Sequence, residues 1–147
     1  MSQITLEALD DGIRVLRLNR PHKRNALTDA TVAELESALR QVAAPRDCRV
    51  LILTGSGADF CAGFDLTSVD EAPGQDESGE VEAWMHRQEA FAGLSTQLRG
   101  FPQPVIAAVN GAATCAGFGL ALGSDIRIAE RAASFSCAFV RDGMSSC

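Results

Sequence analysis

The chain has 147 residues, 46% of them hydrophobic and 22% charged, so it can bury a substantial core as one globular domain over residues 1–147. This composition excludes a collagen-like chain, a disulfide scaffold and a fully disordered chain. The formal net charge of −6 argues against binding to nucleic acid or to an anionic membrane surface.

The five cysteines are an odd number and lack the C-x-x-C spacing of a structural zinc site. We therefore expect free thiols, no bound metal and a reducing, cytoplasmic compartment. Residues 1–4 carry neither the basic segment nor the following apolar run of a secretory leader. An uncharged stretch lies between Arg99 and Asp125, but its prolines and glycines favour a strand, a loop and a short helix over a membrane span.

The first elements predicted along the chain are a hairpin and a helix. Residues 4–9 and 13–18 have β-like composition, and the Asp-Gly pair within residues 10–12 suits a hairpin turn. Thr28 is a predicted N-cap of an amphipathic helix that ends at Pro45. The side chains expected on its buried stripe are Val32, Leu35, Leu39 and Val42.

Strands and helices then alternate. Apolar runs predict buried strands over residues 50–53 and 105–109, and residues 126–129 predict a third strand. Helical spacing connects residues 81–100, and small residues favour a short helix over 117–123. This alternation is typical of an α/β fold with a parallel sheet.

An acidic segment at about residues 67–82 interrupts the alternation and predicts a mobile surface loop. In the helix that follows, we interpret Trp84 and Met85 as core residues. Cys115 and Cys137 are likewise interpreted as packing residues.

Several reactive motifs are absent. The chain has no Gly-x-Ser-x-Gly elbow, and its two histidines, His22 and His86, do not suggest a Ser-His-Asp hydrolase. It has no phosphate loop of the Gly-x-x-x-x-Gly-Lys-Ser/Thr type. Gly111, Gly117 and Gly119 fit no dinucleotide-binding spacing.

Two strand-to-loop junctions remain, over residues 53–66 and 109–119, and both are rich in glycine and alanine. Glycine allows close approach of main chains, and the second junction leads into a helix whose first amides lack internal partners. If the two junctions converge, their N–H groups can hold an oxygen that becomes anionic during a reaction. Each junction taken alone is equally compatible with a tightly packed turn.

Four segments in order, residues 19–27, 60–66, 104–111 and 124–129, resemble the enoyl-CoA hydratase/isomerase family of the crotonase superfamily. The resemblance implies an α/β fold built as a crotonase-like spiral of repeated ββα units, incomplete at the C-terminus. It also implies an acyl-CoA thioester substrate, no cofactor other than the CoA of the substrate, and a homotrimer or hexamer for the full-length chain.

The resemblance places two oxyanion-binding donors on the main-chain N–H groups of Phe64 and Ala116. Arg24, with its neighbours Lys23 and His22, matches a position at which some members hold a CoA phosphate; an ordinary surface charge is the alternative. The substrate-binding residues implied are Arg24, Lys23, Ala62, Gly63 and Gly117.

The departures from the family pattern bear on activity. The two glutamates of the hydratases fall on Gly119 and Phe139, neither of which can transfer a proton. A dehalogenase branch has an aspartate nucleophile where this chain has Cys147, and Asp142 is the carboxylate nearest to the expected pocket; Asp65 is expected to tie its own loop together. Two hypotheses stay open: an acyl-CoA enzyme that stabilises a thioester enolate, or a non-catalytic CoA-binding or interaction remnant of the family.

Overall fold

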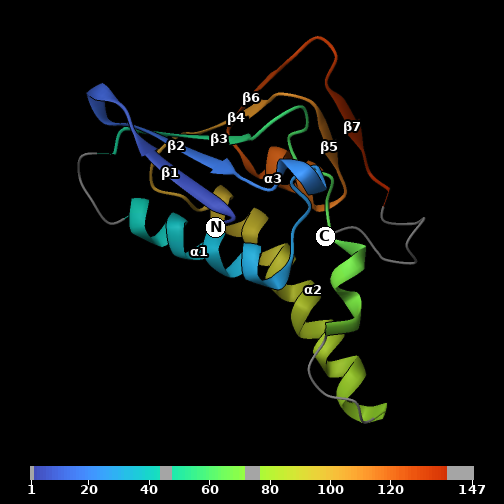
Figure 1. Cartoon of the computed structure of the whole chain (residues 1–147). Coiled ribbons are helices and arrows are strands. Elements are labelled where there is room, and N and C mark those ends of the chain that lie inside the picture. Colours follow the sequence, from blue (N-terminus) through green and yellow to red (C-terminus); the bar gives the residue numbers. More distant parts are fainter. Residues whose placement is uncertain (1, 44–47, 72–76, 139–147) are drawn as a thin grey trace.

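The computed structural model describes residues 2–43, 48–71 and 77–138 of the chain (Figure 1). The strands are β1 (Ile4–Ala8), β2 (Ile13–Leu18), β3 (Val50–Gly55), β4 (Val105–Val109), β5 (Ala112–Thr114), β6 (Ile126–Ala129) and β7 (Ser134–Ser136). The α-helices are α1 (Asp29–Ala43), α2 (Glu77–Arg99) and α3 (Ala116–Gly123), and the short 3-10 helices are η1 (Asp10–Gly12), η2 (Pro21–Lys23) and η3 (Leu66–Glu71).

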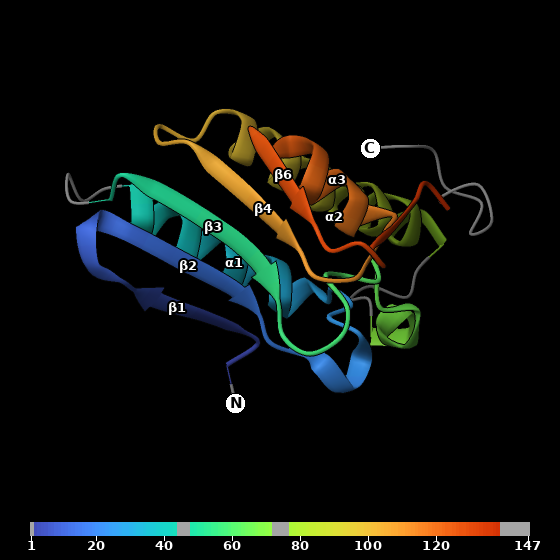
Figure 2. The same ribbon diagram turned by 90° about the horizontal axis from the view of Figure 1, so that it is seen from above.

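Five strands form the main sheet, in the order β1-β2-β3-β4-β6. Only β1 is antiparallel to its neighbour, and β2, β3, β4 and β6 run in parallel (Figure 2). Strands β5 and β7 pair in parallel as a separate small sheet. The predicted α/β class is therefore confirmed, and the main sheet is mixed, with four parallel strands and the antiparallel β1.

Local sequence explains the first elements. Asp11 and Gly12 both adopt positive φ angles, 61° and 78°, as the predicted turn between β1 and β2 requires. Helix α1 begins directly after Thr28, whose Oγ1 accepts a hydrogen bond from the Thr31 N–H at 3.1 Å. In return, the Thr28 N–H donates to Thr31 Oγ1 at 3.3 Å, so two N–H groups at the start of the helix have partners.

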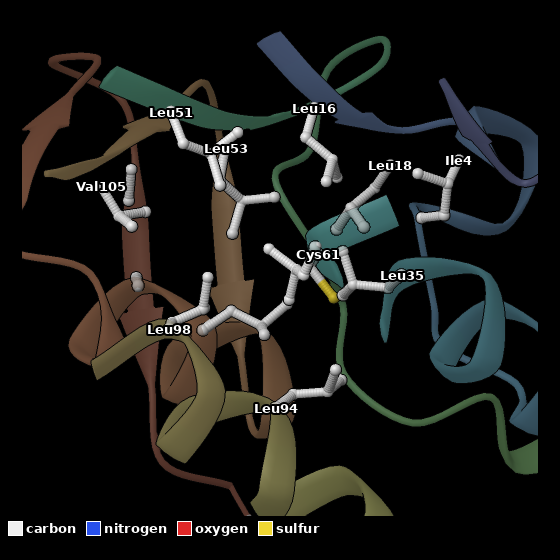
Figure 3. Close-up of a cluster of buried hydrophobic side chains, with 14 of the residues drawn as sticks. Ile4, Leu16, Leu18, Leu35, Leu51, Leu53, Cys61, Leu94, Leu98 and Val105 are labelled. Carbon is white, nitrogen blue, oxygen red and sulfur yellow. The ribbon is translucent and has the colours of Figure 1, made fainter. Parts of the chain in front are cut away.

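The core lies between the sheet and the three α-helices, which cover one face of the sheet (Figure 1). Leucines of β2 and β3 point toward leucines of α1 and α2, and Cys61 lies among them (Figure 3). The fully buried leucines of this layer are Leu16, Leu18, Leu35, Leu51, Leu53, Leu94 and Leu98. Apolar burial on this scale is the main stabilising contribution to the fold.

Two expectations about buried side chains, those for Met85 and Cys137, need correction. Met85 is 60% exposed, because the buried stripe of α2 passes through Arg87, Phe91, Leu94 and Leu98 instead. The side chain of Trp84 lies outside the described part of the chain. Cys137, expected to pack, is exposed beyond the end of β7.

The acidic segment also differs from a continuous loop. Residues 66–71 form η3, and α2 begins at Glu77, several residues before the predicted start at residue 81. A helix N-terminus favours acidic residues, so an acidic composition is compatible with a helix as well as with a loop. No helix within the described residues is both long and apolar enough to cross a membrane.

Candidate functional site

Three loops leave the main sheet at one edge, because β2, β3 and β4 run in parallel and each is followed by a loop (Figure 2). The loops cover residues 19–28, 56–65 and 110–111, and the third continues through β5 into α3. Open α/β sheets bind their ligands at this edge. Every predicted site residue that the structure describes lies on these loops or in the first turn of α3.

Two asparagines hold the middle loop in place. The amide of Asn25, which is 1% exposed, donates to the carbonyl oxygens of Ser56 at 2.9 Å and Asp59 at 2.8 Å. Asn110 donates to the Gly57 carbonyl at 2.9 Å and accepts a hydrogen bond from the Gly55 N–H at 3.1 Å. The loop therefore has its main-chain groups satisfied from both neighbouring loops.

The Gly63–Phe64 peptide is oriented by Leu27. The Leu27 N–H donates to the Gly63 carbonyl at 2.7 Å, and the Asp65 N–H donates back to the Leu27 carbonyl at 2.8 Å. In a trans peptide the C=O and N–H groups point in opposite directions, so the Phe64 N–H points away from Leu27. Within the described part of the chain it donates no hydrogen bond.

The Cys115–Ala116 peptide is oriented by α3. The Cys115 carbonyl accepts a hydrogen bond from the Gly119 N–H at 3.0 Å, so it points along the helix and the Ala116 N–H points out of the helix start. Among the described residues, no acceptor is bonded to the Ala116 N–H. The strained position is Cys115, with φ 49°, whereas Ala116 has no positive φ and an alanine therefore fits.

The two segments that carry these N–H groups are in direct contact. The Cys61 N–H donates to the Ala112 carbonyl at 2.9 Å, and the Thr114 N–H donates to the Cys61 carbonyl at 2.9 Å. A Cβ atom on Gly63 would lie 2.8 Å from the Thr114 oxygen, and one on Gly117 would lie 2.3 Å from the Cys61 oxygen. Only glycine at positions 63 and 117 permits this approach.

Cys61, whose main chain makes this contact, has its thiol buried in the core (Figure 3). Burial raises the pKa of Cys61 to about 12, so its thiol stays protonated at neutral pH. Cys48, Cys61 and Cys115 are buried thiols that form no disulfide bond within the described residues. Across the described ranges, no group of three or more His, Cys, Asp or Glu side chains could hold a metal ion.

Asp65 follows Phe64 directly, and its side chain holds this part of the loop in place. Its carboxylate is buried and pairs with Arg20 at 2.9 Å, while Oδ1 accepts hydrogen bonds from the Thr67 N–H at 3.1 Å and the Thr67 hydroxyl at 2.7 Å. Burial by itself raises the pKa of Asp65, but the hydrogen bonds from Thr67 and Arg20 outweigh it and hold the pKa below its usual value. The expectation that Asp65 ties its own loop together is confirmed.

The basic cluster lies on the first of the three loops. Arg24, with a side chain 63% exposed, pairs with both carboxylate oxygens of Asp59 at 2.9 and 3.0 Å. This hydrogen bonding raises the pKa of Arg24 and lowers the pKa of Asp59. The side-chain ammonium group of Lys23 donates a hydrogen bond to the Thr67 hydroxyl at 3.4 Å. A phosphate that binds Arg24 must therefore share it with Asp59 or displace that carboxylate.

Gly119, the position on which the resemblance places one hydratase glutamate, faces helix α2. A Cβ atom there would lie 3.1 Å from Ser95 Oγ, so two helices pack closely where the family pattern has a carboxylate. Phe139, Asp142 and Cys147 lie outside the described residues.

The residues that sequence reasoning missed are those that hold the loops in place. Asn25 and Asn110 lie inside segments that resemble the family, but their several main-chain partners belong to other loops. Arg87, which contacts the Phe64 ring, stands 23 positions away from it, in the middle of a helix. No local pattern signals such partners; only the positive φ of Asn25, 56°, agrees with the known tolerance of asparagine for that conformation.

Comparison with known proteins finds one family whose members resemble this chain over almost its whole length. The family model for enoyl-CoA hydratase/isomerase matches residues 8–146. The 1,2-epoxyphenylacetyl-CoA isomerase of Escherichia coli is 41% identical over an alignment of 147 positions, which covers 98% of this chain and 54% of that protein. A probable enoyl-CoA hydratase of Rhodobacter capsulatus is 40% identical and covers 92% of this chain and 49% of its own length.

Solved structures agree with this result. Pseudomonas aeruginosa AtuE superposes with a TM-score of 0.88 at 35% identity, over 97% of this chain and 54% of its own. An enoyl-CoA hydratase/isomerase from Marinobacter aquaeolei has the same TM-score and coverage at 31% identity. The chain spans about half the length of the relatives that it matches.

Proposed function

Because the chain belongs to the enoyl-CoA hydratase/isomerase family, we propose that it binds an acyl-CoA thioester and stabilises the oxyanion or enolate of its carbonyl with the N–H groups of Phe64 and Ala116. The observation that supports this most is the contact between the two loops that carry these donors. Neither donor has a partner within the described residues, and Leu27 and α3 hold the two peptides in fixed orientations.

The chemistry follows from these two main-chain groups. When a base removes a proton next to the thioester carbonyl, or a nucleophile adds to it, negative charge develops on the carbonyl oxygen. Two preoriented N–H groups stabilise that charge more than they stabilise the neutral carbonyl, which lowers the barrier. The helix start at Ala116 contributes partial positive charge to the same end of the site.

The alternative, a non-catalytic CoA-binding or interaction remnant of the family, is favoured by Gly119. This position carries no carboxylate and packs against Ser95 instead. An enzyme must then take its proton-transfer group from elsewhere, and Asp142 is the candidate.

Titration calorimetry with acetyl-CoA and crotonyl-CoA, together with a hydration assay, separates the two functions. Binding with turnover supports the enzyme, and binding without turnover supports the remnant. A chain that neither binds nor converts these thioesters contradicts both functions.

The assembly that we propose is a homotrimer or hexamer for the full-length protein. Light scattering during size-exclusion chromatography tests it.

Replacing Arg24 with alanine tests the proposed phosphate contact. We expect Arg24→Ala to weaken binding of acyl-CoA roughly tenfold, because a charge-assisted hydrogen bond contributes about 1.5–3 kcal/mol and part of it is already spent on Asp59. Binding of the matching pantetheine thioester, which lacks the CoA nucleotide, should not change. The measurement is a calorimetric titration with both ligands.

The matched variant is Asp59→Asn, which removes the carboxylate that competes for Arg24. It should bind acyl-CoA more tightly than the unmodified chain, with a steeper dependence on salt. Equal weakening of both thioesters by Arg24→Ala contradicts the phosphate role.

A further inference from the structure

The ring of Phe64 is held by two side chains of α2. The Arg87 guanidinium lies 4.7 Å from the centre of the ring, and the Phe91 ring packs edge-on against it with centroids 5.0 Å apart. Residues 87 and 91 are four positions apart on a helix and therefore share one face. A cation over an aromatic face and an edge-to-face pair are both attractive geometries.

Arg87 is itself fixed in position. It is 9% exposed, and its Nε donates to the Asp29 carboxylate at 2.7 Å while a terminal nitrogen donates to the Ser68 carbonyl at 3.1 Å. Asp29 begins α1 and Ser68 lies in η3, so one guanidinium connects three elements. A buried cation is tolerated because it is paired in this way.

The Phe64 ring and the proposed Phe64 donor belong to the same residue. Hydrogen bonds with Leu27 hold the peptide groups before and after Phe64, and the contacts of its ring with α2 add a second restraint on the same residue. The ring is only partly buried, and its described ring and cation contacts come from α2.

We propose that Arg87 is a positioning residue, which holds the Phe64 ring against α2 and thereby keeps the Phe64 N–H aligned with a bound thioester oxygen. This inference rests on the proposed oxyanion-binding function. It assigns a role to a side chain that touches neither the substrate nor the reacting atoms. It also implies that the aromatic side chain at residue 64 contributes to the site, although the proposed donor is a main-chain group.

The test compares two ligands that differ only in the carbonyl group: butyryl-CoA, a thioester, and S-butyl-CoA, the thioether. The ratio of their dissociation constants measures how well the donors recognise the carbonyl oxygen. We expect Arg87→Met to lower the preference for the thioester roughly tenfold, the effect of losing about one hydrogen bond, with thioether binding unchanged. A general loss of structure would weaken both ligands alike.

Other variants separate positioning from folding. Arg87→Lys keeps the charge but cannot contact Asp29 and Ser68 together while stacking on the ring, so it should restore part of the preference. Asp29→Asn changes a half-exposed residue and should lower the preference by a smaller factor, which keeps the test valid if Arg87→Met does not fold. Arg99→Met, at the exposed end of the same helix, is the control and should behave like the unmodified chain.

A folded Arg87→Met or Asp29→Asn variant with an unaltered thioester preference overturns the role of Arg87 and leaves the proposed function standing. If the unmodified chain itself does not prefer the thioester, the oxyanion-binding proposal fails and this inference fails with it. As a second readout, the carbonyl stretch of bound butyryl-CoA labelled with carbon-13 should move back toward its free-solution frequency in Arg87→Met.

Discussion

Replacing Gly117 with alanine is expected to separate the two loops that carry the proposed donors. The added Cβ would lie 2.3 Å from the Cys61 carbonyl oxygen and 2.7 Å from the Cys61 Cβ. Because the first of these atoms is main chain, no side-chain rotation relieves the overlap, and the loops must move apart. We expect a loss of stability at the upper end of the roughly 1–3 kcal/mol usual for overpacking.

The same change should damage ligand binding, because the Thr114–Cys61 hydrogen bond and the relative position of the Phe64 and Ala116 amides depend on this contact. The expected results are a melting temperature lower by about 5–10 °C and a thioester affinity lower by at least roughly tenfold. Differential scanning fluorimetry and calorimetry measure the two effects.

Gly93→Ala is the matched control for this experiment. Gly93 lies inside α2, where an added Cβ would meet no heavy atom within 4 Å. Alanine should therefore stabilise the helix by about 0.5–1 kcal/mol and leave ligand binding unchanged. If Gly117→Ala is as stable and binds as tightly as the unmodified chain, the close approach of the loops is not required.

The sequence predicts those parts of the fold that depend on neighbouring residues. The sequence predicts the hairpin, α1, β3, β4, α3 and β6, because each has a local signal of its own: a turn, a cap, an apolar run, an apolar spacing or a run of small residues. Strands β5 and β7 were not separately predicted. Each has three residues, and they pair only because the chain returns to the same place 22 residues later.

The error at Met85 has a physical cause, which is that burial is decided by the partners that the fold supplies. The buried stripe of α2 contains a charged residue, Arg87, which apolar spacing assigns to the surface. Asp29 and Ser68, its partners, are distant in sequence and make that burial possible. Since the stripe passes through Arg87, Met85 faces solvent.

The sequence predicts the segments of the candidate site, but it does not predict how they are oriented. Glycine spacing and family resemblance were sufficient to locate the segments around Phe64 and Ala116, and their contact through Gly63 and Gly117 is a property of the folded chain. The orientation of the Gly63–Phe64 peptide could not be derived from the sequence, because it depends on the N–H of Leu27.

Replacing Asp65 with asparagine is expected to produce the second large effect. The change leaves the Arg20 guanidinium, with a side chain only 14% exposed, without its carboxylate. Removal of one partner from a buried ion pair costs about 3–5 kcal/mol. The loop that carries Phe64 also loses the hydrogen bonds from Thr67 to a charged acceptor, so thioester binding should weaken in parallel.

The pH dependence of the free energy of unfolding tests whether the ionised Asp65 carboxylate accounts for this loss of stability. The pKa of Asp65 is lowered in the folded chain, so its contribution to stability is complete above the unfolded value of about 3.9 and is lost as the pH falls through the folded value. The free energy of unfolding of Asp65→Asn should thus lie well below that of the unmodified chain at pH 7, and the difference should narrow below about pH 4.

Urea denaturation of both chains between pH 7 and pH 3 measures this difference. Glu36→Gln is the control, since Glu36 pairs with the exposed Arg40 at 3.5 Å on the surface of α1 and should change stability by at most about 0.5 kcal/mol. A difference between the Asp65→Asn and unmodified chains that stays constant over the whole range would show that the ionised carboxylate is not what anchors the loop. The Phe64 amide would then owe its orientation to Leu27 and α2 alone, and Asp65→Asn should bind thioesters as well as the unmodified chain.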